Sequence, residues 1–185
     1  VLICFVIGVP LGVIASYNKW YRDIQNVVLD AMQTLPYFCY LIPVLMFFGG
    51  NIVSAVIATV IYSVPPIIRL TALGLSQVSG SYSEVSKSFG GTGIQTLNKV
   101  KFPLAVPSLV MGFNQTVIMA FAMQIVTPLI GGKGLGLQVF NALQRSDTGR
   151  GLSAGLAIVL LAIIIDRITH AWTKKQRQAL GLDKS

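Results

Sequence analysis

Long stretches without charged side chains alternate along this chain with short clusters of basic and acidic residues. Residues 1–18 carry no charge, residues 31–68 form an uncharged run of 38, and residues 102–132 and 151–165 are again uncharged. A helix needs about 20 apolar residues to cross a bilayer, so the run at 31–68 is long enough for two crossings. Gly49-Gly50-Asn51 favours a turn that divides it. The pattern predicts five membrane-spanning helices, within residues 1–18, 31–48, 52–75, 102–132 and 151–165.

The composition also indicates a membrane environment. Hydrophobic residues make up 54% of the 185 positions, charged residues make up 11%, and the mean hydropathy is +0.72. A soluble domain carries roughly 25% charged residues, and disordered segments are poor in apolar residues, so both classes are excluded. The expected fold is an all-α polytopic membrane protein. The last uncharged run has only 15 residues, and Asp166 and Arg167 at its end are expected to snorkel to the interface.

The basic residues are divided unequally between the two sides that these helices define. Segments 16–25, 69–102 and 166–185 contain eleven Lys and Arg residues, whereas the opposite side contains only three, which are Lys133, Arg145 and Arg150. Cytoplasmic loops are enriched in Lys and Arg, so the first side is expected to be cytoplasmic and to include the C-terminus. The net charge of +8 falls in clusters between uncharged runs, a pattern of membrane loops rather than of a nucleic-acid-binding surface.

This reading divides the chain into a membrane domain, residues 1–172, and a basic cytoplasmic tail, residues 173–185. Val1 opens an apolar run that has neither a basic leader nor a cleavage site. We therefore expect the chain to be truncated at its N-terminus and to begin inside or just before a span.

The cytoplasmic segment between residues 76 and 102 is too long for a simple turn, and its sequence predicts two short helices. Ser81-Tyr82-Ser83-Glu84 matches a capping box that would open the first helix, and Gly90-Gly91 would end it. Thr92-Gly93-Ile94-Gln95 matches a second box, opening a helix toward Lys101, and Pro103 suits the first turn of the next span. Such a pair of helices is either a docking element or an ordinary ordered loop.

The same segment resembles the EAA loop of the membrane subunits of ABC importers. Glu84 is followed by Gly90 six positions on, and by Val100, Phe102 and Pro103, the last of them nineteen positions on. Val85-Ser86 stands where the family has Ala-Ala, Val100 replaces Ile and Phe102 replaces Leu. Further stretches resemble the glycine betaine/L-proline permease branch, and these are residues 29–36, 65–71, 112–116 and 163–169.

The resemblance implies a type I importer membrane domain with a MetI-like core of five spans and two short coupling helices. Two copies would form a homodimeric path for glycine betaine or proline in a bacterial inner membrane. A cytoplasmic ATPase would dock on the EAA loop, and an extracytoplasmic binding protein would deliver substrate. The chain itself would be no enzyme, would hold no cofactor or metal, and would leave ATP to its partner. Choline, carnitine or another small solute, or an ATP-independent carrier, are the alternatives.

Polar residues within the spans are candidates for the path or its gate. Asp30 and Arg69 lie near the cytoplasmic ends of two spans, where Asp30 would pair with Arg69, contact a cationic substrate, or simply meet water. Asn114, Gln115 and Gln124 should face the protein interior, either in hydrogen bonds between helices or as pore lining.

Two further segments concern the substrate and the outer face. Tyr37, with Phe38 and Tyr40, could line a path for a quaternary ammonium group, which aromatic rings bind well. Residues 131–136 lack the spacing of a nucleotide-binding loop and are expected to form a bend before a short helix at 135–145. Arg145, Asp147 and Arg150 are candidates for contact with the binding protein, and His170 is not expected to bind metal.

Overall fold

The computed structural model describes residues 1–179, which fold entirely into helices and connecting turns. The helices are α1 (Leu2–Tyr17), α2 (Lys19–Thr34), α3 (Phe38–Phe48), α4 (Ile52–Ser63), α5 (Pro65–Ser76), α6 (Gly80–Ser88), α7 (Gly93–Thr96), the π-helical turn η1 (Leu97–Lys101), α8 (Phe102–Gln124), the 3₁₀ turn η2 (Thr127–Ile130), α9 (Leu135–Gln144) and α10 (Thr148–Ala179).

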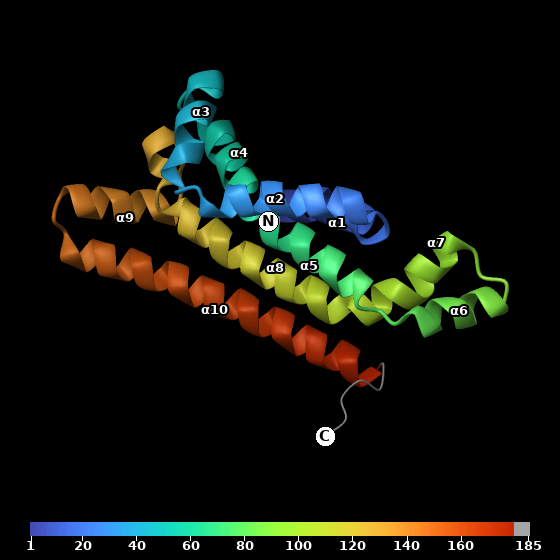
Figure 1. Cartoon of the computed structure of the whole chain (residues 1–185). Helices are drawn as coiled ribbons and strands as arrows, with labels where there is room; N and C mark the ends of the chain where they lie inside the picture. The colour runs from blue at the N-terminus through green and yellow to red at the C-terminus, as the bar shows by residue number, and fades with distance from the viewer. Residues whose placement is uncertain (180–185) are drawn as a thin grey trace.

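The helices form an elongated bundle with one projecting arm. Figure 1 shows α1, α5, α8 and α10 running along the long axis, while α3 and α4 rise away from it as a pair. Helices α6 and α7 lie at one end of the bundle, and α9 lies at the other end, beside the start of α10. The expected cytoplasmic loop and the expected outer helix are therefore at opposite ends of the molecule.

The helices only partly match the five predicted spans. Within residues 1–179, three helical stretches, Ile52–Ser76, Gly93–Gln124 and Thr148–Ala171, are long and apolar enough to cross a membrane. Helices α2 and α3 together supply a fourth if they count as one span, although they meet at an angle of 96°. Helix α1 is apolar but has only 16 residues. The presence of several spans is confirmed, and the number five stays a prediction.

One predicted boundary is wrong. The second span is expected to begin at residue 31, but α2 already begins at Lys19 and ends at Thr34, with Leu35 as its C-cap before Pro36. The residue before a proline is disfavoured in helical geometry, so the chain bends there instead of continuing into α3. The span predicted within the uncharged run 102–132 is α8, which ends at Gln124 before the chain turns through η2.

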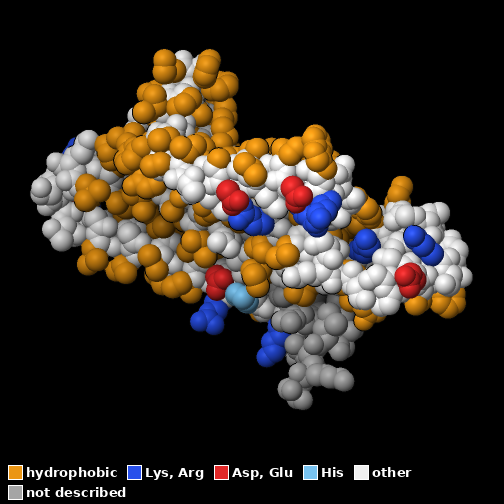
Figure 2. Space-filling view, viewed as in Figure 1, with side chains coloured by type: hydrophobic (Ala, Val, Ile, Leu, Met, Phe, Trp, Pro, Cys, Tyr) orange, Lys and Arg blue, Asp and Glu red, His pale blue; other side chains and the backbone are white. Residues whose placement is uncertain are grey.

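The surface is far more apolar than that of a soluble domain. Met46 and Phe47 on the arm are 80% and 84% exposed, and large apolar side chains are exposed along α10 as well. Figure 2 shows the arm covered by hydrophobic side chains, while charged groups gather in a band along the bundle. Contiguous exposed apolar surface of this extent marks contact with lipid or with partner proteins.

Helix α5 is the centre of the bundle and packs against both α1 and α8. Its residues Ile67 and Thr71 are completely buried. The approach of α1 depends on Gly12, where an added Cβ would stand 2.5 Å from the Thr71 Cβ and 2.7 Å from the Ile68 carbonyl oxygen. On the other side, a Cβ at Gly74 would stand 2.5 Å from the Ser108 Cβ on α8. Both interfaces leave no room for a side chain at these glycines.

The boundary expected at residue 172 lies within α10, which continues as helix to Ala179. Residues 180–185 of the expected tail lie outside the described residues, and the division of the chain at this point stays a prediction.

We expect Gly12→Leu to destabilise the folded subunit by about 1–3 kcal/mol, because overpacking forces α1 away from α5. Thermal unfolding of the purified protein, followed by size-exclusion chromatography, measures this effect. Gly155→Leu is the matched control, since a Cβ at Gly155 meets nothing within 4 Å. Equal loss of stability in the two variants would contradict the role given to the α1–α5 contact.

Candidate functional site

Helix α6 begins earlier than the sequence suggested. Its N-cap is Ser79, whose side-chain oxygen accepts a hydrogen bond from the Ser81 backbone N–H. The Ser81 hydroxyl lies 2.8 Å from the Ser79 hydroxyl, inside the first turn. The predicted capping box from Ser81 to Glu84 is therefore wrong, because Ser79 occupies the capping position and Ser81 is already part of the helix.

The bend after α6 matches its prediction. Gly90 has a φ of +74°, a conformation that costs glycine little and other residues more. The Gly91 backbone N–H donates to the Ser86 carbonyl oxygen at 2.9 Å, which closes the helix end. Phe89, at the tip of the bend, is 89% exposed. The chain thus reverses at Gly90 and presents an aromatic ring to its surroundings.

The second capping box is present, but the helix it opens is not a separate one. Gln95 N–H donates to the Thr92 hydroxyl at 3.4 Å, and Thr92 N–H donates to the Gln95 side chain at 2.9 Å. Helix α7 then passes through η1 directly into α8, forming one helical stretch from Gly93 to Gln124. Pro103 lies in the first turn of α8, as predicted. Proline has no N–H to donate to the helical hydrogen bonds. The backbone hydrogen bonds take the π-helical pattern over η1, just before Pro103, and the helix continues instead of ending there.

The EAA-like segment, residues 84–103, has one face outward and one inward. Glu84 and Val85 on α6 are exposed, and so is Ile94 on α7. Ser86 joins the two arms through a 2.8 Å contact between its hydroxyl and that of Thr96. Val100 and Pro103 are half-buried, and Phe102 packs with Leu97 against the core cluster of Leu75, Ala105 and Leu109. The segment therefore offers an acidic and apolar outer surface on a base anchored in the bundle.

Asp30 and Arg69 form an ion pair between α2 and α5. Arg69 Nη2 lies 2.5 Å from Asp30 Oδ1, with the Arg69 and Asp30 side chains 37% and 63% exposed. Both residues line a cavity of about 400 Å³, together with Arg22 and Asn26 of α2. Of the three alternatives for Asp30, which are pairing with Arg69, contact with a cationic substrate and contact with water, the structure shows the pair with Arg69. Both side chains of the pair still reach solvent.

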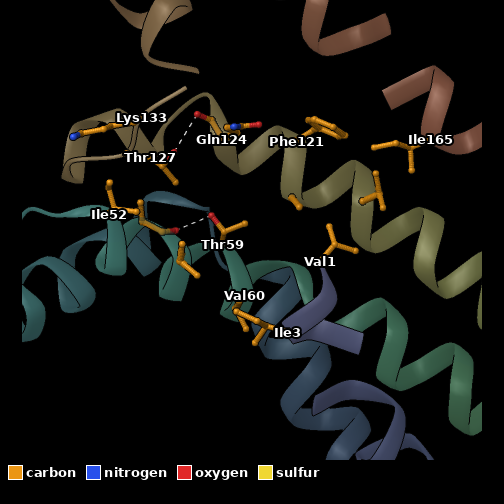
Figure 3. Close-up of a pocket in the computed structure, with 15 residues that line it drawn as sticks. Val1, Ile3, Ile52, Thr59, Val60, Phe121, Gln124, Thr127, Lys133 and Ile165 are labelled. Carbon is orange, nitrogen blue, oxygen red and sulfur yellow. Dashed lines mark hydrogen bonds between the residues drawn. The ribbon is translucent and has the colours of Figure 1, made fainter. Parts of the chain in front are cut away.

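The three polar residues predicted to face the interior are divided between two cavities. Asn114 and Gln115 line a cavity of about 630 Å³ beside α8. Gln124 lines a second one, of about 320 Å³, between the start of α1 and helices α4 and α8. Figure 3 shows Gln124 and Thr127 at one side of this second cavity, where the Thr127 hydroxyl donates to the Gln124 carbonyl at 3.1 Å, with Val1 and Ile3 farther along it. No single site contains all three.

A polar cluster at the first cavity was missed by the sequence analysis. Asn114 Nδ2 donates to Asp166 Oδ1 at 3.2 Å, and His170 Nε2 lies 3.4 Å from the same oxygen. From the sequence, Asp166 is expected only to snorkel to the interface, and His170 is considered only as a metal ligand and rejected. Their spacing of four residues on one helix was the available signal, because side chains at that spacing share a face. Within residues 1–179, no three His, Cys, Asp or Glu side chains gather closely enough to hold a metal ion.

The aromatic side chains expected to line a path do not gather at one place. Tyr37 and Phe38 are exposed, and their rings stack at a tilt with centroids 4.6 Å apart. Tyr40 is buried in the arm instead, where its hydroxyl donates to the Met32 carbonyl oxygen and its ring packs edge-on against Tyr62. Only Tyr37 and Phe38 remain available to a solute.

The bend and the short helix predicted for the outer end of the bundle are both present in the structure. After a left-handed Gly131, the chain turns and forms α9 over almost the predicted range. Asp147 receives the Arg150 backbone N–H at 3.1 Å, at the start of α10. Asp147 and Arg150 therefore already serve to fix a helix end, and their contact with a binding protein stays a prediction.

Comparison with known proteins settles the family. The family model described as "Binding-protein-dependent transport system inner membrane component" matches residues 8–178. The chain belongs to this family.

Relatives of this inner membrane component include proteins named for betaine transport. The glycine betaine/carnitine transport permease protein GbuB of Listeria monocytogenes is 46% identical over 95% of this chain. The glycine betaine transport system permease protein OpuAB of Bacillus subtilis is 43% identical over 92%. The glycine betaine/proline betaine permease protein ProW of Escherichia coli is 44% identical over 95%. The chain spans 62%, 60% and 50% of the lengths of these three relatives.

The fold of the inner membrane component is also found among solved structures. An inward-facing structure of the MetNI methionine ABC transporter superposes with a TM-score of 0.77, covering 91% of this chain and 87% of that chain at 22% identity. A second crystal form gives a TM-score of 0.68 at 21% identity. The MetI-like fold expected from the sequence is confirmed.

We expect Asp30→Ala and Arg69→Ala to destabilise the subunit non-additively, because each change leaves the other charge without its partner. The coupling energy should be small, about 0.2–1 kcal/mol, since both side chains reach solvent. A double-mutant cycle on thermal unfolding measures it. Strict additivity would show that the 2.5 Å contact contributes nothing to the packing of α2 on α5.

Proposed function

We propose that this inner membrane component forms the translocation path of an ATP-driven importer for glycine betaine and related quaternary ammonium osmolytes. The observation that carries the proposal is the 43–46% identity, over more than nine-tenths of the chain, to three permease proteins named for glycine betaine transport. Two copies form the path in a bacterial inner membrane, with the C-terminus in the cytoplasm. Carnitine or choline is the alternative substrate, since one relative is named for glycine betaine and carnitine.

The residues 84–103 couple this path to a cytoplasmic ATPase. Glu84 and Val85 supply exposed acidic and apolar contacts, while Ser86 and Gly90 shape the bend that presents them. Because α7 continues through η1 into α8, a displacement of the docked surface is transmitted along one helical stretch. Val100, Phe102 and Pro103 form the joint at which the coupling segment becomes the span.

Movement of α8 would act directly on the polar surfaces of the path. Asn114, Gln115 and Gln124 all lie on this helix. Asp30 and Arg69 form a pair between α2 and α5 that a gate could break and remake. Tyr37 offers an exposed ring beside the bend between α2 and α3.

The partner proteins supply what the chain does not. ATP is bound and hydrolysed by the ATPase, so the chain is no enzyme and holds no cofactor of its own. An extracytoplasmic binding protein delivers the solute at the end formed by α9 and the start of α10, where Arg145, Asp147 and Arg150 lie.

The full-length subunit, reconstituted in proteoliposomes with its ATPase and binding protein, should import labelled glycine betaine only when ATP is present. Gly90→Val should reduce this uptake by about tenfold or more, because a β-branched residue at a φ of +74° distorts the docking bend. Uptake rate and ATPase activity, measured together, separate loss of coupling from loss of transport capacity.

Gly80→Ala provides the matched control, since Gly80 is equally uncrowded but has an ordinary φ. It should transport as the unmodified protein does. Betaine uptake without ATP would contradict the importer and favour a secondary carrier. Uptake of a different solute, delivered by the same binding protein, would retain the architecture and replace the substrate.

A further inference from the structure

The cavity beside α8 is an elongated groove with an acidic group at one wall. Its lining along α8 extends from Pro107 to Met119, a distance of about 18 Å at 1.5 Å per residue. Gln33 of α2 closes one side, and Asp166 and His170 of α10 close the other. Figure 2 shows the pale-blue histidine beside an acidic side chain on the face toward the viewer. We refer to this space as the α8 groove.

The α8 groove contains one carboxylate, that of Asp166, and none of the ten residues that line the groove is Lys or Arg. The one basic residue of the lining is His170, whose Nε2 lies 3.4 Å from Asp166 Oδ1. The Asp166 side chain is 40% exposed, and its contacts with Asn114 and His170 both fall on Oδ1. Asp30, in contrast, holds an arginine at 2.5 Å. The two acids therefore differ, because Asp30 is paired with an arginine and Asp166, among the described residues, is not paired with Lys or Arg. The Asp166 carboxylate is thus the one open to a cationic solute.

A second observation concerns the residue that holds the Asp166 carboxylate in place. Asn114 is only 8% exposed, and its Oδ1 is buried without a hydrogen-bond partner among the described residues. A buried amide oxygen of this kind needs a compensating partner or costs stability. Asn114 at the same time fixes the Asp166 carboxylate through Nδ2. Asn114 thus orients the Asp166 carboxylate through its Nδ2, while its own Oδ1 has no hydrogen-bond partner among the described residues.

The remaining lining matches a soft, methylated cation. Met111, Ile118 and Met119 supply polarisable and apolar surface beside the carboxylate. The amides of Gln33 and Gln115 can donate to a carboxylate at the far end of a zwitterion. No aromatic ring lines the groove, so it lacks the cage that gives tight quaternary ammonium binding. Weak binding suits a transit site, because a transported solute must also leave.

We infer that the α8 groove is a transit site in which Asp166, oriented by Asn114, contacts the trimethylammonium group of the solute. Asp166 is the charged contact, and Asn114 is a positioning residue. This inference rests on the proposed function for the identity of the solute, but the cation preference of the groove is a property of the chain itself.

The test uses the assembled transporter in nanodiscs, with Gln115→Cys as a reporter in the groove and Cys39→Ser to remove the exposed native thiol. Two methanethiosulfonate reagents, one with a trimethylammonium head and one with a sulfonate head, modify the reporter. Their rates are followed by mass spectrometry of this subunit. The cationic reagent should react at least about fivefold faster, after normalisation to a free thiol, and millimolar glycine betaine should slow it.

Asp166→Asn should bring the ratio of the two rates close to one, and Asp166→Glu should restore the preference for the cationic reagent. Asp23→Asn is the matched control, since Asp23 is an exposed acid outside the groove and its loss should leave the ratio unchanged. A preference that survives in Asp166→Asn would overturn the inference. So would a reporter that neither reagent reaches, because a second copy would then cover the groove.

Uptake measurements distinguish failure of this site from failure of the proposed function. In proteoliposomes, Asp166→Asn should lower the maximal uptake rate by about threefold to tenfold while the ATPase is still stimulated by loaded binding protein. Unmodified protein that shows the cation preference but imports no betaine would refute the proposed substrate and leave the cation site standing. Normal import by Asp166→Asn, with assembly intact, would refute the site and leave the importer standing.

Discussion

The close packing of α5 between α1 and α8 is the constraint on which the rest of the structure depends. Gly12 and Gly74 allow the three helices to approach until backbone and side chain touch. Lipid gives helices no hydrophobic reason to associate, so close contact between small residues must supply the attraction. With α5 fixed in this way, Arg69 lies opposite Asp30, and α8 presents its polar side chains to the cavities on either side.

Helix α8 runs from the EAA-like segment toward the opposite end of the bundle, and no break in the helix separates it from α7. A proline at residue 103 would ordinarily start or interrupt a helix, yet the chain stays helical through the π-helical turn η1, and Figure 1 shows it bending where α7 meets α8. The EAA-like segment is therefore asymmetric. Its first arm, α6, ends at the bend of Gly90, whereas its second arm continues as helix into α8. In the proposed function, a displacement of the bend has one continuous helical route into the bundle.

Charge clusters and glycine positions made much of this fold predictable. The turn at Gly49-Gly50, the bend at Gly90 and the helix after Gly134 follow from local chemistry, and the structure contains each of them. The angle between α2 and α3 could not be read from apolar run lengths, since a proline decides it and run lengths ignore backbone geometry. The misplaced cap at Ser81 had a different cause: four serines lie within residues 76–83, and only the helix start decides which one caps.

The missed Asp166 cluster shows what a charge-based reading overlooks. Asp166 ends an uncharged run beside Arg167, and that position alone suggests interfacial anchoring. Its partners come from α8, 52 residues earlier, and from the next turn of its own helix, so only the tertiary arrangement connects them. Asp30 and Asp166 differ in the partners that hold their carboxylates. An acid paired with an arginine already has a cationic partner, whereas an acid held by an amide and an imidazole keeps affinity for a cationic solute.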